Sequence, residues 1–202
     1  GLTVGGTLGG KLADWRRMPS LIATLALIGV VLALLWVSMR NNLNWLRVAD
    51  YIAVNVPFGM LFGRLANFVN GELYGRPADV PWAMVFPSDP SGLARHPSQL
   101  YQAGLEGLAM MIIMLSLFWL TKARWKPGVL VGVFTIGIAT ARFINEFFRQ
   151  PDAHLTEFAA SSGLSMGQWL SIPMILVGVA VVVYALRNPS ASKGAPLTAS
   201  ES

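Results

Sequence analysis

The chain has 202 residues, of which 54% are hydrophobic and only 12% charged, whereas a soluble domain usually carries about 25% charged residues. Because the apolar surplus falls into long runs, the composition excludes an ordinary soluble domain and indicates a polytopic membrane protein. The net charge of +5 comes from basic residues scattered over short connections, so we expect no nucleic-acid partner. The absence of cysteine excludes disulfides, thiolate metal sites and a cysteine nucleophile.

The first apolar run predicts a membrane-spanning helix. Residues 1–18 are rich in glycine and stay unassigned, whereas residues 19–39 carry no charge and match the roughly 20 residues that a spanning helix needs. A second apolar segment, about 49–70, contains Pro57 and Gly59, which we expect to break or kink it. A break at membrane depth is tolerated only where the chain packs on protein or lines a cavity.

A polar stretch rich in Pro and Gly, residues 72–95, predicts a small extramembrane head. Residues 96–120 form the third predicted helix. Its first half carries Gln99, Gln102 and Glu106 at positions i, i+3 and i+7, so a polar stripe is expected to descend one helix face into the bilayer.

Two further apolar runs complete the predicted membrane body. The fourth helix is expected at about 128–148, and the fifth at about 166–186 with a kink at Pro173. The expected fold is therefore an all-α polytopic membrane protein with about five transmembrane helices and a small head. Residues 19–187 would form one transmembrane domain, and residues 188–202 a disordered tail.

The charges of the short connections predict the orientation. Connections 40–47 and 121–127 hold basic residues and no acid, whereas the alternate connections hold the acids. The basic connections and the C-terminal tail are therefore expected on the cytoplasmic side, with the head outside. Lys11, Arg16 and Arg17 conflict with this orientation. Both this conflict and a first residue other than methionine are expected if the chain lacks its N-terminal part.

The stretch GRLANFVNGELYGR, residues 63–76, brings charged and amide side chains to the end of an apolar helix. Arg64, Asn67 and Gly71 would share one helix face. An arginine at or near membrane depth costs several kcal/mol unless it is paired, so Arg64 indicates a functional site.

A second polar stripe lies at the end of the fourth predicted helix. Arg142, Glu146 and Arg149 stand at i, i+4 and i+7. With Arg64 they carry a surplus of positive charge, which an anion such as a lipid phosphate would balance.

A structural role for these charges remains an alternative. Arg142 and Glu146 could neutralise each other, and Arg64 could pair with Glu106 or Glu72 between helices. His96, which precedes a proline, is by itself as consistent with an interfacial residue as with a base.

Three motifs carry a resemblance to a known family. GRLANFVNGELYGR, RHPSQLYQ and RFINEFFRQPDA resemble the prolipoprotein diacylglyceryl transferases of bacterial inner membranes, and the similarity extends from about Val48 to Met174. The resemblance implies an enzyme that moves the diacylglyceryl group of phosphatidylglycerol to the lipobox cysteine of a prolipoprotein. It also implies a multi-pass inner-membrane protein with a periplasmic head, a site open to the outer leaflet, and no cofactor or metal.

The resemblance also implies roles for individual residues. A thiol with a pKa of about 8.5 must lose its proton, and the departing phosphate must be held as its charge grows. Arg64 would hold the phosphate, and the base would be one of three residues, Glu146, Glu72 or His96. The implied substrate-binding residues are Arg64, Asn67, Gly71 and Gly75, and the implied catalytic residues are Arg142, Glu146, Glu72 and His96.

One family motif has no counterpart in the sequence. The family's His-Gly-Gly motif, counted back from Arg64, falls near Thr24, Leu25 and Ala26, and no histidine precedes His96. The alternative function is therefore a family member that binds phospholipid or lipoprotein without transfer.

Overall fold

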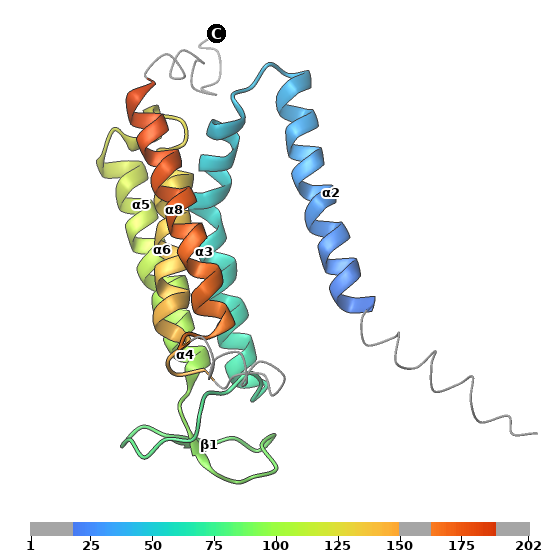
Figure 1. Ribbon diagram of the computed structural model, residues 1–202, viewed down its shortest axis with the longest axis vertical. Helices are drawn as coiled ribbons and strands as arrows, with labels where there is room; N and C mark the ends of the chain where they lie inside the picture. Colours follow the sequence, from blue (N-terminus) through green and yellow to red (C-terminus); the bar gives the residue numbers. More distant parts are fainter. Residues whose placement is uncertain (1–17, 150–162, 189–202) are drawn as a thin grey trace, which may run out of the picture. The chain divides into compact units, whose positions relative to one another are not determined.

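The computed structural model describes residues 18–149 and 163–188. It separates into two units, Gly1–Trp45 and Leu46–Ser202. The described part of the first unit is dominated by α2 (Met18–Arg40), which is drawn in blue in Figure 1. The guanidinium of Arg40 stacks over the Trp36 ring at 5.2 Å. The helix predicted at 19–39 is confirmed.

Helices make up the membrane body of the second unit (Figure 1). Among the described residues of both units, three helical spans are long and apolar enough to cross a membrane, and two apolar helices are shorter: Ile28–Arg40, which is part of α2, and Val129–Asn145. The protein is therefore a helical membrane protein. The elements are α3 (Trp45–Val69), α4 (Ser98–Gln102), the π-helix η1 (Ala103–Ala109), α5 (Met110–Leu120), the 3₁₀ turn η2 (Ala123–Trp125), α6 (Val129–Asn145) and α8 (Met166–Arg187).

The prolines do not interrupt their helices. α3 continues through Pro57, and α8 continues through Pro173, so the second apolar segment is not broken at Pro57, and the alternative, a kink there, stays a prediction. Each proline removes one backbone hydrogen bond of its helix. Pro57 is fully buried, and packing against the neighbouring helices holds the helix together on both sides of it.

Glycines let the helices of the second unit approach closely. A Cβ atom on Gly132 of α6 would lie 3.0 Å from the carbonyl oxygen of Gly178 on α8. A Cβ atom on Gly178 would likewise lie 3.0 Å from the carbonyl oxygen of Gly132. A Cβ atom on Gly107 of η1 would lie 2.7 Å from the Cα atom of Leu61 on α3. Small residues serve in this way at membrane helix interfaces, where backbone contact replaces side-chain packing.

A buried carboxylate joins α3 to the start of α6. Asp50 accepts hydrogen bonds from the backbone N–H groups of Gly128, at 2.8 Å, and Val131, at 2.7 Å. The first N–H groups of a helix have no partner within the helix, and α6 has no side-chain cap of its own. The cap therefore comes from another helix and fixes α3 relative to α6.

The segment between α3 and α4 contains a small hairpin. β1 (Met84–Val85) pairs antiparallel with β2 (Ala94–Arg95). The buried Arg95 donates a 2.5 Å hydrogen bond from Nε to Oδ2 of Asp89 and lies over the Tyr74 ring at 4.9 Å. The predicted head at 72–95 is therefore a folded segment held by an ion pair and a small sheet.

Gly71 lies beyond the end of α3. The N–H of Gly71 donates to the carbonyl oxygen of Phe68 at 3.1 Å, and the N–H of Glu72 donates to the carbonyl oxygen of Asn67 at 2.9 Å. With φ at +67° for Gly71, this is a Schellman motif, which favours glycine. The prediction that Gly71 shares a helix face with Arg64 was therefore wrong.

The stability of the head should depend on pH. The hydrogen bond from Arg95, followed by one from Ser91, lowers the pKa of Asp89 from 3.8 to about 2. Because the pKa is lower in the folded state, the stabilisation is complete above about pH 4 and is lost as pH falls towards 2. The rate of hydrogen exchange of residues 84–95, corrected for intrinsic rates, should rise in the wild type as pH falls from about 4 to 2. In Asp89→Asn the exchange rate should already be high at about pH 6. The exposed Asp79 offers a control, since Asp79→Asn should behave like the wild type.

Candidate functional site

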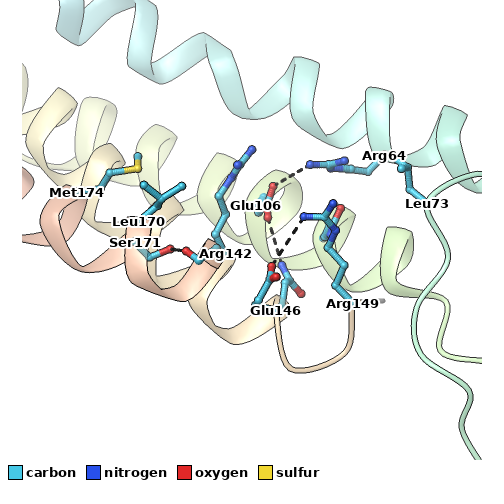
Figure 2. A pocket seen from close by; sticks show the side chains of 12 residues that line it. Arg64, Leu73, Glu106, Arg142, Glu146, Arg149, Leu170, Ser171 and Met174 are labelled. Carbon is cyan, nitrogen blue, oxygen red and sulfur yellow. Dashed lines mark hydrogen bonds and ion pairs between the residues drawn. The ribbon is translucent and has the colours of Figure 1, made fainter. Parts of the chain in front are cut away.

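A polar cavity of about 280 Å³ lies where α3, η1, α6 and α8 meet (Figure 2). Five charged side chains of the described residues line it. The lining residues are Arg64, Leu73, Gln102, Glu106, Arg142, Asn145, Glu146, Arg149, Gly167, Leu170, Ser171 and Met174.

Glu106 is the buried acid of this cavity. Its side chain is 1% exposed, and its Oε2 atom lies 3.6 Å from Nη2 of Arg64, whose side chain is 22% exposed. Nδ2 of Asn145 donates to Oε1 of Glu106 at 3.4 Å. Figure 2 shows Glu106 between α3 and the end of α6. Gly107, the next residue, is the point where α3 contacts η1, which explains how Arg64 reaches a carboxylate on another helix.

The second group of charges lies at the end of α6. Arg142 belongs to the last turn of α6, where a cation interacts favourably with the helix dipole. Glu146 and Arg149 follow the helix and form an ion pair at 3.9 Å. Within residues 18–149 and 163–188, the guanidinium of Arg142 has no ion-pair partner. Of the pairings that the structural alternative offered, an ion pair of Arg142 with Glu146 is absent from the described residues, whereas the contact of Arg64 with Glu106 is present.

The charges of the described residues on the cavity wall sum to a positive value. Three guanidinium groups and two carboxylates line it, which leaves one positive charge in surplus. Arg64 and Arg142 come from different helices and line the same cavity. Guanidinium groups bind the oxygen atoms of phosphates and carboxylates in forked geometry. The arrangement is suited to an anion with several oxygen atoms.

The start of α8 closes one side of the cavity. Ser165 and Gln168 form a capping box, in which each side chain bonds the backbone N–H of the other residue. A Cβ atom on Gly167 would lie 2.7 Å from Oε2 of Glu146. Glycine at this position therefore lets the Glu146 carboxylate approach the first turn of α8, whose dipole favours negative charge.

An open groove along α3 adjoins the cavity. It is lined by Val56, Gly59, Met60, Gly63, Arg64, Asn67 and Arg142, so it shares both arginines with the cavity. Cβ atoms added to Gly59 or Gly63 would have no neighbour within 4 Å. The two glycines, one helical turn apart, leave an apolar channel that ends at the guanidinium groups.

The structure divides the predicted site residues into two groups. Arg64, Arg142 and Glu146 line the cavity, and Asn67 lines the adjoining groove. The remaining predicted residues, Gly71, Glu72, Gly75 and His96, lie outside the cavity lining.

The residues outside the cavity lie in the head or connect it to the helices. The Glu72 side chain is exposed, and its backbone carbonyl accepts a 2.5 Å hydrogen bond from Gln99. Gly75 donates to the carbonyl of His96 at 2.9 Å, and a Cβ atom there would lie 2.5 Å from the carbonyl oxygen of Phe148. Glycine is therefore required where the head crosses the chain that follows α6.

His96 lies among aromatic rings. Its ring packs edge-on against Tyr101 and Phe148. Nδ1 lies 3.1 Å from the Tyr101 hydroxyl, which accepts a hydrogen bond from Nε1 of Trp82 at 2.7 Å. The Tyr101 hydroxyl thus links the His96 ring to the Trp82 indole, and the tautomer of His96 sets whether Nδ1 accepts or donates in this contact.

The list of predicted site residues omitted several polar residues of the cavity wall. Gln102 and Glu106 belong to the stripe read from the third predicted helix, and an acid within an apolar helix was the available signal. Asn145 and Gly167 carried no comparable signal, because neither breaks a pattern in the sequence. Within the described ranges, no group of three or more His, Asp or Glu residues is arranged to hold a metal ion.

Comparison with known proteins gives a consistent result. Residues 26–184 match the family model described as prolipoprotein diacylglyceryl transferase. A phosphatidylglycerol–prolipoprotein diacylglyceryl transferase of Erythrobacter litoralis is 75% identical over 169 residues, covering 84% of this chain and 59% of the relative. One of Zymomonas mobilis is 52% identical over 157 residues, covering 78% and 54%. The chain therefore spans little more than half the length of these relatives.

The two acids of the cavity should differ in their contribution to stability. Glu106→Gln leaves the Arg64 guanidinium without its charge partner in a largely buried place, so we expect a loss of roughly 3 kcal/mol. Glu146→Gln removes a pair whose arginine side chain is 42% exposed, so the loss should stay below about 1 kcal/mol. Unfolding midpoints in mixed micelles measure both. Equal losses would contradict the assignment of Glu106 as the central acid.

Proposed function

We propose a function from the premise that the chain belongs to the prolipoprotein diacylglyceryl transferase family: transfer of the diacylglyceryl group of phosphatidylglycerol to the lipobox cysteine of prolipoproteins. The relatives are named for phosphatidylglycerol and prolipoprotein as their substrates. The cavity supplies a chemical reason why a lipid with a phosphate would bind here.

One observation carries the proposal: Arg64 and Arg142, from two separate helices, line one cavity with a positive surplus. In the proposed complex, the lipid phosphate lies between these two guanidinium groups. The groove along Gly59 and Gly63 then receives an acyl chain, because it is open, largely apolar and ends at the same arginines. Asn67, which lines this groove, is proposed as a further contact to the lipid.

The proposed reaction is a displacement at carbon. The cysteine thiolate attacks the glycerol carbon that carries the phosphate, an S–C bond forms as the C–O bond breaks, and glycerol phosphate leaves with the electron pair. Charge grows on the departing phosphate oxygen, and preorganised guanidinium groups stabilise it. The thiol proton needs an acceptor, and of Glu146, Glu72 and His96 only Glu146 lines the cavity. We therefore propose Glu146 as the base.

The remaining implied residues receive supporting roles in the proposal. Gly75 and His96 join two segments of the head by a backbone hydrogen bond, and the neighbouring Arg76 donates to the carbonyl oxygen of Phe148 after α6. Gly71, seven residues after Arg64, forms the turn that follows α3. In the proposal these residues position the cavity wall, and none of them takes part in the bonds that form or break.

We also propose an orientation in the bacterial inner membrane. The cavity and the head lie at the end of α6 that faces the periplasm, and the basic connection 121–127 lies at its other end on the cytoplasmic side, together with the C-terminus. Arg124 supports this orientation, since it stacks on the rings of Trp119 and Trp125 at 5.8 and 5.0 Å, and such basic and aromatic groups favour the membrane interface.

The arginines of the cavity provide the test. Transfer from phosphatidylglycerol to a lipobox peptide should fall at least about a hundredfold in Arg64→Ala and in Arg142→Ala, because each removes a group that stabilises the leaving phosphate. Arg124→Ala, at the opposite end of the helices, is the matched control and should retain transfer. The assay follows the lipidated peptide by mass spectrometry.

Two outcomes would count against the proposal. Retained transfer in either cavity variant would exclude the shared phosphate site. A wild-type protein that binds phosphatidylglycerol without transfer would instead favour the alternative, a family member that binds phospholipid or lipoprotein only.

A further inference from the structure

One wall of the cavity carries buried oxygen atoms that accept no hydrogen bond from the described residues, although one of them, Oε2 of Glu106, forms the ion pair with Arg64. Within the described part of the chain, Oε1 of Gln102, Oε2 of Glu106 and Oδ1 of Asn145 lack any hydrogen-bond partner. The three residues are 7%, 1% and 3% exposed, and all three line the cavity. A buried acceptor without a donor is costly, and groups of this kind in native proteins call for an explanation.

The orientation of Asn145 follows from its neighbour. Its Nδ2 group donates to Oε1 of Glu106 at 3.4 Å, and an ionised carboxylate can only accept. The carbonyl oxygen of Asn145 must therefore point away from that contact. At Asn145 the wall thus offers an acceptor to whatever occupies the cavity.

A ligand for this wall has to supply donors and also satisfy the cations opposite. Hydroxyl groups donate without adding charge, whereas an ammonium group would be repelled by Arg64, Arg142 and Arg149, which line the same cavity. Glu106 lies next to both the acceptor atoms and the cations, since its carboxylate also contacts the Arg64 guanidinium at 3.6 Å. Hydroxyl groups on the second and third carbons from a phosphate ester oxygen, as in a glycerol headgroup, would reach both sides together.

We propose that Gln102, Glu106 and Asn145 form a subsite for the free hydroxyl groups of the glycerol headgroup of phosphatidylglycerol. The inference rests on the proposed function, in which Arg64 and Arg142 hold the adjacent phosphate. It assigns headgroup selection to the α4–η1 segment and to the last residue of α6. A lipid with the same phosphate but no hydroxyl groups leaves these acceptors unpaired, and sites that hydrogen-bond a substrate hydroxyl reject analogues lacking it.

Gln99 provides a control on the same helical segment. It is fully buried and also has an Oε1 atom without a partner, but it does not line the cavity. Its Nε2 group donates to the carbonyl of Glu72. A purely structural effect of losing a buried glutamine should therefore be visible at Gln99 as well as at Gln102.

The test compares three short-chain lipids for binding to the detergent-solubilised protein by calorimetry: dihexanoyl phosphatidylglycerol, the matched phosphatidylpropanol, and phosphatidylethanolamine. The wild type should bind phosphatidylglycerol about tenfold more tightly than phosphatidylpropanol, and phosphatidylethanolamine no better than phosphatidylpropanol. In Gln102→Met and in Asn145→Leu, the preference for phosphatidylglycerol should fall to about threefold or less. In Gln99→Met it should stay near the wild-type value.

The outcomes separate this inference from the proposed function. Equal affinity of the wild type for phosphatidylglycerol and phosphatidylpropanol would overturn the hydroxyl subsite and leave the phosphate site standing. An equal loss for both lipids in Gln102→Met would assign that residue to packing and would also overturn it. Tighter binding of phosphatidylethanolamine would show that the wall selects an ammonium group. Failure of the wild type to bind any of the three lipids would overturn the proposed function itself.

Discussion

The contact between Arg64 and Glu106 is the constraint on which the site depends. A guanidinium group near membrane depth is tolerated only with a partner, and the partner here is a carboxylate 3.6 Å away on another helix. The contact requires close backbones, which Gly107 permits against Leu61, and it requires η1 to present Glu106 towards α3. Because Glu106 also accepts from Asn145, one buried acid connects α3, η1 and the end of α6. The cavity forms between these three elements.

Much of this architecture follows from local sequence features. The apolar runs predicted the helices closely, because an apolar segment of about 20 residues is the length that a membrane-spanning helix needs. The spacing of Arg142 and Glu146 predicted that they share one side of the chain, and both line the cavity. Gly71 was placed incorrectly because a helical face was extended past Val69. The same glycine is what ends the helix, and its preference for positive φ was the competing signal.

Other features could not be read from one sequence, because they depend on contacts between distant segments. The contribution of Gly167 to the site requires knowing that α8 begins beside Glu146. The continuity of α3 through Pro57 depends on the surfaces that bury that residue. The positions of Gly75 and His96 depend on the backbone hydrogen bond between them and on the bond that the neighbouring Arg76 donates to Phe148 after α6. Similarity to a family indicated that these residues matter, whereas the structure indicates what each one contacts.

The cap that Asp50 provides for α6 has a consequence for the opposite end of the same helix. α3 and α6 are held together at two separated points, through Asp50 at one end and through Glu106 with Asn145 at the other. Two such supports leave little freedom for the arginines of the two helices to separate. The free energy of folding therefore offsets the mutual repulsion of the two guanidinium groups. A bound anion then meets cations that are already positioned, so binding requires no further rearrangement of the two helices.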